Sequence, residues 1–236
     1  MANKNQRREP RPPRRVGKRR AGARTARHVR ALRAVAVPPA AVPAASFNPF
    51  FAFPPAPPPQ DDPRALAPRE ILFGGRPHVM RLLSTADEDR LISFFNSHTE
   101  ETIRQRYGYH ISEMTHERAR RLVGVDQSRD VALGVFERAP DGGEVLHAVG
   151  RYLLDAAGRS AEMAFVVREN KRGLGICTAL LRALLRIARL RGMSFLYAQV
   201  QADNAPMLSI FRRHGGRMKA IPGADAMEVF VPTALP

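Results

Sequence analysis

A basic, glycine-rich stretch over residues 168–181, RENKRGLGICTALL, contains the residue types and spacing that most clearly suggest chemistry. A strand-like run precedes it and an amphipathic run follows it, so the turn would open directly into a helix. Such a turn exposes backbone N–H groups at the positive end of the helix dipole, which together form a cradle for an oxyanion. Gly173 and Gly175 would let the backbone approach the anion without a Cβ in the way, while Lys171 and Arg172 add positive charge. A basic connection with a flexible turn is the alternative interpretation.

Two well-known phosphate-binding loops do not fit this stretch. A P-loop requires Gly-Lys followed by Ser or Thr at the end of its turn, whereas this turn continues from Gly175 through Ile176 and Cys177 to Thr178. A dinucleotide fingerprint requires a third glycine at the position of Thr178 and a continuing series of parallel strands. The runs that precede the turn are instead typical of an antiparallel meander.

The hydrophobic pattern along the chain predicts the elements that position this turn. Thr85 and Glu88 have the spacing of a capping box and start a helix after a strand. A longer helix follows the turn over residues 176–191, with Gly192 just beyond its end. The other expected elements are strands over residues 78–83, 130–138, 144–155, 160–167 and 195–202, short helices over 99–107, 115–125 and 205–216, and a closing hairpin around Pro222-Gly223.

This order of elements, with the turn in its place, resembles the GNAT superfamily of acyl-CoA-dependent N-acyltransferases. Its signature, Gln/Arg-x-x-Gly-x-Gly/Ala, is matched by residues 170–175, and its Asn after the next strand by Asn204. The resemblance covers about residues 78–232 and, within the superfamily, is closest to the acetyltransferase domain of bacterial protein lysine acetyltransferases. AVGRYLLD, AEMAFVVRENKRGLGICTALLRALLRIARLRGM and ADNAPMLSIFRRHGG resemble successive blocks of that domain. The implied fold is α/β (α+β), with a mixed, mostly antiparallel central sheet flanked by helices.

The resemblance also implies acetyl-CoA as the co-substrate and indicates which residues bind it. The backbone of Phe165, Val166 and Val167 would hold the acyl group and pantetheine, and Asn204 would contact the pantetheine arm. The pyrophosphate would lie against Lys171, Arg172, Gly173, Leu174, Gly175, Ile176, Cys177 and Thr178.

Two positions depart from the family pattern. Asn170 replaces the usual Gln or Arg at the head of the signature, which weakens a contact there but leaves the backbone cradle available. Phe211 stands where many members carry a Tyr that protonates the leaving thiolate. Water or another residue would then reprotonate CoA, or the thiolate would leave unaided, since a thiol has a pKa of about 8.5.

Glu162 is the candidate catalytic base. A lysine acceptor is mostly ammonium at neutral pH, and only its free base can attack a thioester. The family comparison places a catalytic Glu at this strand position, and Glu162 is also the only acid between Asp155 and Glu169. Partial burial would raise its pKa toward the useful range. A solvated glutamate at a strand end is the alternative.

The remaining reactive residue types fit structural roles better. His147 and His214 have no second ligand or nucleophile at a telling spacing, so we expect packing or surface roles and no metal site. Cys177 lies in the first turn of a helix, where a thiolate can be stabilised. Because the family transfers the acyl group directly to the amine, Cys177 is expected to line the core or the cradle.

Charge and composition divide the chain of 236 residues into two parts. Thirteen of the 38 Lys and Arg lie in residues 1–36, and fourteen of the 20 prolines lie before residue 70. Residues 1–69 are therefore predicted to be a disordered basic tail and Pro-rich linker, with an apolar island over 46–53, and residues 70–236 to be the folded domain. We expect a cytoplasmic protein without a membrane partner, for three reasons. The chain has a single cysteine, and no apolar run approaches the roughly 18 residues that cross a bilayer. The N-terminus is also unlike a secretory signal.

Three functions are open at this point. The leading hypothesis is acetyl transfer to protein lysines, and the nearest alternative is acetyl transfer to a small amine, because the acceptor region over residues 96–130 is poorly defined by pattern. A different class is a non-catalytic acyl-CoA sensor or nucleic-acid-binding module. Its basic residues 1–36 would contact phosphates without sequence preference, although no aromatic residue precedes Phe47 to stack on bases.

Overall fold

The computed structural model of the protein describes residue 53 and residues 58–60, 62–107, 112–139, 142–155 and 160–234. The basic segment over residues 1–36 and the predicted island, apart from Phe53, lie outside the described residues. None of the described helices has the length and apolar character that crossing a membrane requires.

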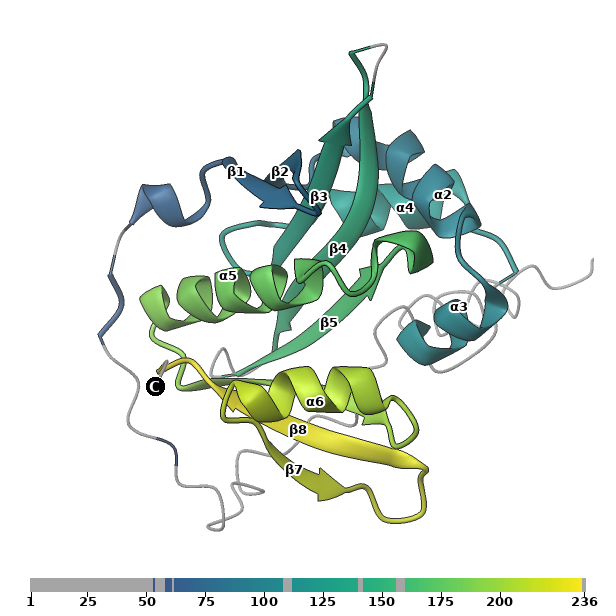
Figure 1. Cartoon of the computed structure of the whole chain (residues 1–236). Helices are drawn as coiled ribbons and strands as arrows, with labels where there is room; N and C mark the ends of the chain where they lie inside the picture. Colours follow the sequence, from purple (N-terminus) through teal and green to yellow (C-terminus); the bar gives the residue numbers. More distant parts are fainter. Residues whose placement is uncertain are drawn as a thin grey trace, which may run out of the picture. The chain divides into compact units, whose positions relative to one another are not determined.

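One eight-stranded sheet organises the described residues, in the order β1-β2-β3-β4-β5-β6-β8-β7 (Figure 1). Its strands are β1 (Arg69–Phe73), β2 (Arg76–Leu82), β3 (Val131–Arg138), β4 (Glu144–Leu154), β5 (Ala161–Val167), β6 (Phe195–Gln201), β7 (Arg217–Ala220) and β8 (Ala226–Pro232). Six of the neighbouring pairs are antiparallel and β5–β6 is parallel. The mixed, mostly antiparallel sheet expected from the sequence is confirmed.

Helices cover both faces of this sheet (Figure 1). Helix α5 crosses β3 to β6 on one face, and Phe211 of α6 joins the same core, while α2 packs on β4 and α4 on α2 at the other face. The α-helices are α2 (Glu88–Asn96), α3 (Glu100–Tyr107), α4 (His116–Val123), α5 (Ile176–Leu190) and α6 (Ala205–Arg213), and the short 3₁₀ turns are η3 (Pro63–Ala65), η4 (Thr85–Asp87) and η5 (Glu169–Lys171).

Helix α5 forms where the periodicity predicts it, and its apolar face enters the core. Ile176, Leu180 and Leu184 are at most 1% exposed. Gly192 follows the helix with φ of 77°, the left-handed conformation expected of a glycine just beyond a helix end. On the sheet, Gly150 permits close packing, because a Cβ there would lie 3.1 Å from Leu180 Cβ. The helix that carries the turn is therefore fixed against β4.

The chain enters the sheet earlier than the sequence pattern suggests. The first strand was expected at residue 78, but β2 begins at Arg76 and is preceded by β1. Gly74 and Gly75 join the two strands with φ of 57° and 76°. Two consecutive positive φ angles characterise the tight turn whose twist matches paired strands. The Gly-Gly dipeptide was the sequence signal for this hairpin.

Part of the predicted linker contacts the folded domain. Asp62 caps η3 and pairs with Arg186 of α5 at 2.8 Å. The backbone N–H of Gln60 donates to Leu190 O at 2.7 Å. The ring of Phe53 stacks on Phe195 with centroids 5.2 Å apart. The segment that leads into β1 is thus attached at the end of α5 and the start of β6.

The two central strands β5 and β6 part after a short region of pairing. Their parallel register includes only Ala161 with Leu196 and Glu162 with Tyr197. The remainder of β5, from Met163 to Val167, continues beside β4 alone. Because β6 has moved away, the backbone groups on the side of β5 opposite β4 have no strand partner over these residues.

Two hydrogen bonds establish which β5 residues have that orientation. Asp155 N donates to Ser160 O at 2.8 Å, and Arg168 N donates to His147 O at 2.9 Å. Bonded and non-bonded pairs alternate along an antiparallel ladder. The backbone N–H and C=O groups of Phe165 and Val167 therefore point away from β4, at the place where β5 and β6 diverge.

Candidate active site

The glycine turn has the backbone geometry of an anion cradle. Gly173 and Gly175 have φ of 79° and 84°, and a Cβ at either position would meet no atom within 4 Å. The first helical bond runs from Ala179 N to Gly175 O at 3.0 Å. The N–H groups of residues 176–178 thus have no acceptor inside the helix, as at any helix start. These N–H groups follow Gly173 and Gly175 directly in the chain, and both glycines are exposed to solvent.

The two cations of the turn are held by other side chains. Lys171 donates to Glu137 Oε2 at 2.6 Å, and its side chain is 16% exposed. Arg172 donates to Thr102 Oγ1 at 2.6 Å, with half of its side chain exposed. The charge that the sequence assigns to the cradle is therefore already paired in part, and Arg172 is the more accessible of the two.

Residue Glu169 ties the turn to α3. Its carboxylate accepts from Thr102 Oγ1 at 2.7 Å and from Thr99 N at 3.1 Å. Burial alone would raise its pKa, but these hydrogen bonds bring the pKa of Glu169 down to about 2. The adjacent Asn170, at the head of the signature, is exposed. The turn is thus anchored on one side and open on the other.

Side chains from β5, α5 and α6 meet beside the diverging strands. Phe165 and Phe211 have ring centroids 6.1 Å apart, and Phe211 is 1% exposed. Cys177 contacts Met207 through their sulfur atoms at 3.7 Å. Burial raises the pKa of the Cys177 thiol to about 12, so this side chain stays neutral at physiological pH. Phe211 is a packing residue.

Asn204 lies at the start of α6. Its side-chain oxygen accepts from Met207 N at 3.2 Å and so caps the helix. The amide NH₂ of the same side chain is not used in this cap, so it remains a donor for a ligand. The structure therefore gives Asn204 a local structural role besides the one that the resemblance implies.

The carboxyl of Glu162 lies at the last point of pairing between β5 and β6. Its cross-strand neighbours are Leu153 on β4 and Tyr197 on β6. Burial raises the pKa of Glu162 above its usual value, and the charge of Arg106 on α3 opposes that rise. Because its pKa is raised, this half-buried carboxylate is a stronger base than an exposed glutamate.

Two neighbours of Glu162 were not singled out from the sequence. Tyr197 is 9% exposed, and the pKa of its phenol is raised by burial and by the charges of Glu162, Asp155 and Glu228. Arg106 comes from α3, which the pattern predicted as a helix without indicating which strand it covers. Neither Tyr197 nor Arg106 could be found from spacing in the sequence, because β6 and α3 are distant from β5 along the chain and come together with it only in the fold.

A small cavity lies on the same face of the sheet as Glu162. It has a volume of about 20 Å³ and is bordered by α2, α3, α4, β4 and β5, with Arg106 and Val166 in its wall. A cavity of this size has room for about one water molecule.

Known proteins share this fold. The family model described as "Acetyltransferase (GNAT) family" matches residues 88–215. The GNAT domain of Streptomyces lividans PAT is similar in structure, with a TM-score of 0.64 and 22% identity over 73% of this chain and 99% of that domain. A chimera of spermidine N-acetyltransferase SpeG from Vibrio cholerae and hSSAT has a TM-score of 0.51 and 13% identity over 66% of this chain and 96% of its own.

A larger relative also shares the fold. The cAMP-binding acyltransferase from Mycobacterium smegmatis has a TM-score of 0.50 and 21% identity over 73% of this chain, which spans 50% of that protein. Likeness at these identities concerns the fold alone, whereas the family model matches more than half of the sequence. The turn between β5 and α5, the parting of β5 from β6 and this match agree: the chain belongs to the GNAT acetyltransferase family.

Proposed function

We propose that this protein is an acetyl-CoA-dependent N-acetyltransferase that acetylates lysine side chains of proteins, with Glu162 as the general base. Membership of the GNAT family supports acyl-CoA-dependent transfer in general. The proposal that this chain itself catalyses the transfer depends chiefly on the position of Glu162, a half-buried carboxyl at the end of the β5–β6 pairing. A family member that transferred nothing would have no need of a base at this point.

The residues present fit acetyl-CoA. The space beside Gly173 and Gly175, where a Cβ would meet no atom within 4 Å, leaves room for a pyrophosphate against the first N–H groups of α5. Phe165 and Val167 offer backbone N–H and C=O groups where the strands part, at the place where a pantetheine amide would pair. Arg172, half exposed, can exchange its contact with Thr102 for a phosphate oxygen.

Acetyl-CoA, when bound, supplies a thioester; an amine forms the new C–N bond to its acetyl carbon, and the C–S bond breaks to release CoA. The acceptor lysine must first lose a proton, because its ammonium has a pKa of about 10.4. Glu162 takes that proton, directly or through a water molecule, and its raised pKa narrows the gap between the two groups. Backbone N–H groups of β5 hold the acetyl oxygen as it gains negative charge.

No tyrosine is needed to protonate the leaving group. Phe211 is buried and has no proton to give. Tyr197 lies beside Glu162, but its pKa is raised above the ordinary 10, whereas a thiol has a pKa of about 8.5. Transfer of a proton from this phenol to the thiolate would be uphill, so we infer that the thiolate leaves unaided and is protonated only afterwards, by equilibration of CoA with the protons and buffer of the solvent.

The charges near the base favour a cationic acceptor. The charges of Glu162, Asp155 and Glu228 all raise the pKa of Tyr197, so these carboxyl groups lie near its phenol, and Glu228 among them is paired with Lys219 at 2.7 Å. A lysine ammonium would be attracted there before it is deprotonated. The blocks of sequence that resemble protein lysine acetyltransferases support a protein acceptor, and the single Cys177 fits the cytoplasm that we include in this proposal.

A panel of acceptors tests this function. The purified chain is incubated with labelled acetyl-CoA and with folded proteins, lysine peptides, polyamines and aminoglycosides, and products are identified by mass spectrometry. We expect acetyl groups on lysine Nζ atoms of proteins. Acetylation restricted to polyamines or aminoglycosides would exclude the protein acceptor but keep the acyltransferase. Hydrolysis of acetyl-CoA without any acetylated amine would contradict both.

A further inference from the structure

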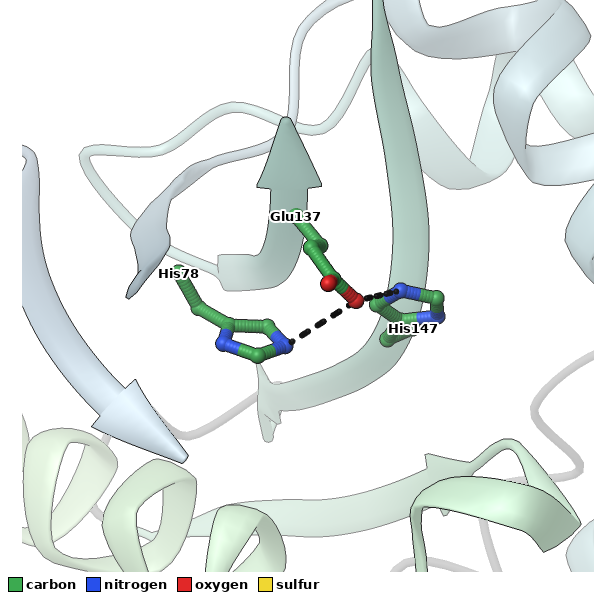
Figure 2. Close-up of side chains that lie close together, drawn as sticks. All are labelled: His78, Glu137 and His147. Carbon is green, nitrogen blue, oxygen red and sulfur yellow. Dashed lines mark hydrogen bonds and ion pairs between the residues drawn. The ribbon is translucent and has the colours of Figure 1, made fainter. Parts of the chain in front are cut away.

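Three potential metal ligands come together on three neighbouring strands, away from Glu162. His78 on β2 lies directly opposite Glu137 on β3. His147 is the extra residue at an irregularity of β4, since Val135 pairs with Ala148 and Phe136 with Leu146. The bulge brings the imidazole of His147 to the same carboxylate, as Figure 2 shows. Bulges commonly redirect a side chain in this way.

The geometry of the cluster is compact and sheltered. Glu137 Oε2 lies 2.9 Å from His147 Nε2 and 3.6 Å from His78 Nε2 (Figure 2). One ligand atom from each residue lies within 4.8 Å of the other two. The side chains of His78 and His147 are 1% and 9% exposed, and that of Glu137 is 16% exposed. Solvent reaches the cluster through the carboxylate.

The tautomer of His78 leaves a lone pair facing the carboxylate. Its Nδ1 lies 2.9 Å from the carbonyl oxygen of Arg76, which can only accept, so Nδ1 carries the proton and donates. The buried Nε2 of the same ring has no hydrogen-bond partner among the described residues. A lone pair opposite a carboxylate oxygen is favourable only when a cation, either a proton or a metal ion, lies between them. A backbone carbonyl bound to the far ring nitrogen is the usual support of a metal-binding histidine.

We propose that His78, Glu137 and His147 form a binding site for a divalent transition-metal ion of the zinc class, which displaces the ammonium of Lys171. Two imidazoles and one carboxylate are a ligand set that zinc accepts, with a water molecule in the fourth position. Ligand atoms at about 2.0–2.2 Å from a tetrahedral ion lie roughly 3.4 Å apart. The two separations from Glu137 Oε2, 2.9 and 3.6 Å, are close to this value, and the ligand atoms of the two imidazoles lie within 4.8 Å of each other.

Lys171 is the competitor for this site. Its Nζ lies 2.6 Å from Glu137 Oε2, and Arg76 contacts the other carboxylate oxygen at 3.0 Å. A metal ion on Oε2 competes with the ammonium, because two cations bound to one carboxylate oxygen repel each other. The affinity of the wild-type chain is therefore reduced by the Lys171 charge, which makes this residue the most informative position to change.

The sequence alone predicts no metal site, because the three ligands are far apart and His147 has no partner at a telling spacing. Cross-strand pairing of β2 with β3, together with the bulge in β4, is what assembles them. This proposal does not depend on acyl transfer.

Zinc titration calorimetry on the chelator-treated full chain without a histidine tag tests the site. We expect the wild type to bind one Zn²⁺ per chain. Glu137→Gln and His147→Ala should bind Zn²⁺ at least about tenfold more weakly than the wild type, and Lys171→Met at least about tenfold more tightly. His116→Ala is the matched control, because His116 also contacts a carboxylate, Glu88 at 2.8 Å, but its side chain is 69% exposed. We expect no change in that variant.

A second measurement covers variants that fail to fold. Zn²⁺ should raise the melting temperature of the wild type and more strongly that of Lys171→Met, and Co²⁺ should give the visible absorption of a tetrahedral site in both. No Zn²⁺ binding to either protein, or the same affinity in both, would overturn the proposal. Equal weakening in His116→Ala and His147→Ala would also overturn it.

Discussion

At the scale of single residues, the proposed chemistry depends on one carboxyl group. Glu162 combines three properties: it is half buried, its pKa is raised, and it lies where β5 and β6 stop pairing. Glu169, in the turn that follows β5, has instead a lowered pKa because its carboxylate accepts several hydrogen bonds. A general base must both accept and release a proton, and a raised pKa serves that purpose better than a lowered one.

The pH dependence of turnover follows from this shift. Burial disfavours the charged form of Glu162, so its pKa in the folded protein lies above the ordinary value of about 4.3. The base is active only when deprotonated, so kcat/KM should rise with pH through that raised pKa. The effect on stability has the opposite sign: this group stabilises the fold at low pH and loses that contribution as pH rises through its folded pKa. A profile that is flat down to pH 4 would contradict the assignment.

Cys177 gives a second prediction at this scale. With a pKa of about 12, its thiolate fraction at pH 8 is roughly a thousandfold lower than that of a free thiol of pKa about 8.5. Alkylation by iodoacetamide should therefore be at least about a hundredfold slower in the folded protein than in urea. The chain has one cysteine, so mass spectrometry reports this site alone. Comparable rates in the two conditions would show that the thiol is accessible and ionised.

At the scale of elements, the functional unit is β5, the glycine turn and α5. The strand offers backbone groups on its unpaired edge, the turn has two glycines with positive φ, and the helix supplies its first N–H groups. Helix α3 is joined to this unit through Glu169 and its bonds to Thr99 and Thr102. The proposed acetyl-CoA site therefore needs all three elements, because none of them alone presents every group that would contact the ligand.

A pair of glycine substitutions separates strain from loss of the cradle. Gly173→Glu adds a negative charge and a side chain at the open side of the turn, so acetyl-CoA binding should fall by at least about a hundredfold. Gly142→Glu is the matched control, because Gly142 also has a φ of 84° and a Cβ there would meet no atom within 4 Å, but it lies in the β3–β4 turn. Calorimetry with acetyl-CoA should show near wild-type affinity for the control. Equal losses in both variants would mean that strain alone is responsible.

Local patterns predicted most of these elements but not their partners. Helix α5 and the meander have clear periodicities of 3.6 and 2, and the turn has its glycines. The hairpin of β1 with β2 was missed because β1 is short and borders the Pro-rich segment. The bond from Lys171 to Glu137 and the place of Tyr197 beside Glu162 arise from packing between elements distant in sequence. The spacing of residues along the chain therefore could not predict these two contacts.

At the scale of the whole chain, the basic N-terminal region and the acyltransferase domain are different in composition. The segment that joins them is partly attached, because Asp62 bonds to Arg186 and Phe53 stacks on Phe195. The predicted boundary at residue 70 also falls one residue inside β1, which begins at Arg69. We therefore propose that the folded unit needs residues before position 70.

Truncation tests this proposal. A chain that begins at residue 53 retains the contacts of Phe53, Gln60 and Asp62, so its melting temperature should match that of the full chain. A chain that begins at residue 76 loses these contacts together with β1, and should melt several degrees lower. Differential scanning calorimetry measures both. Equal melting temperatures would show that the segment contributes nothing to the fold.

The most direct test of the central claim is a comparison of Glu162→Gln with the wild type in acetyl-CoA binding and in turnover. Glutamine keeps the shape of the side chain but cannot accept the proton, so we predict unchanged affinity for acetyl-CoA by calorimetry and a loss of kcat of at least about a hundredfold. Glu117→Gln, which changes a carboxylate 66% exposed on α4, should match the wild type in both. Turnover retained in Glu162→Gln would contradict the role of Glu162 as the base.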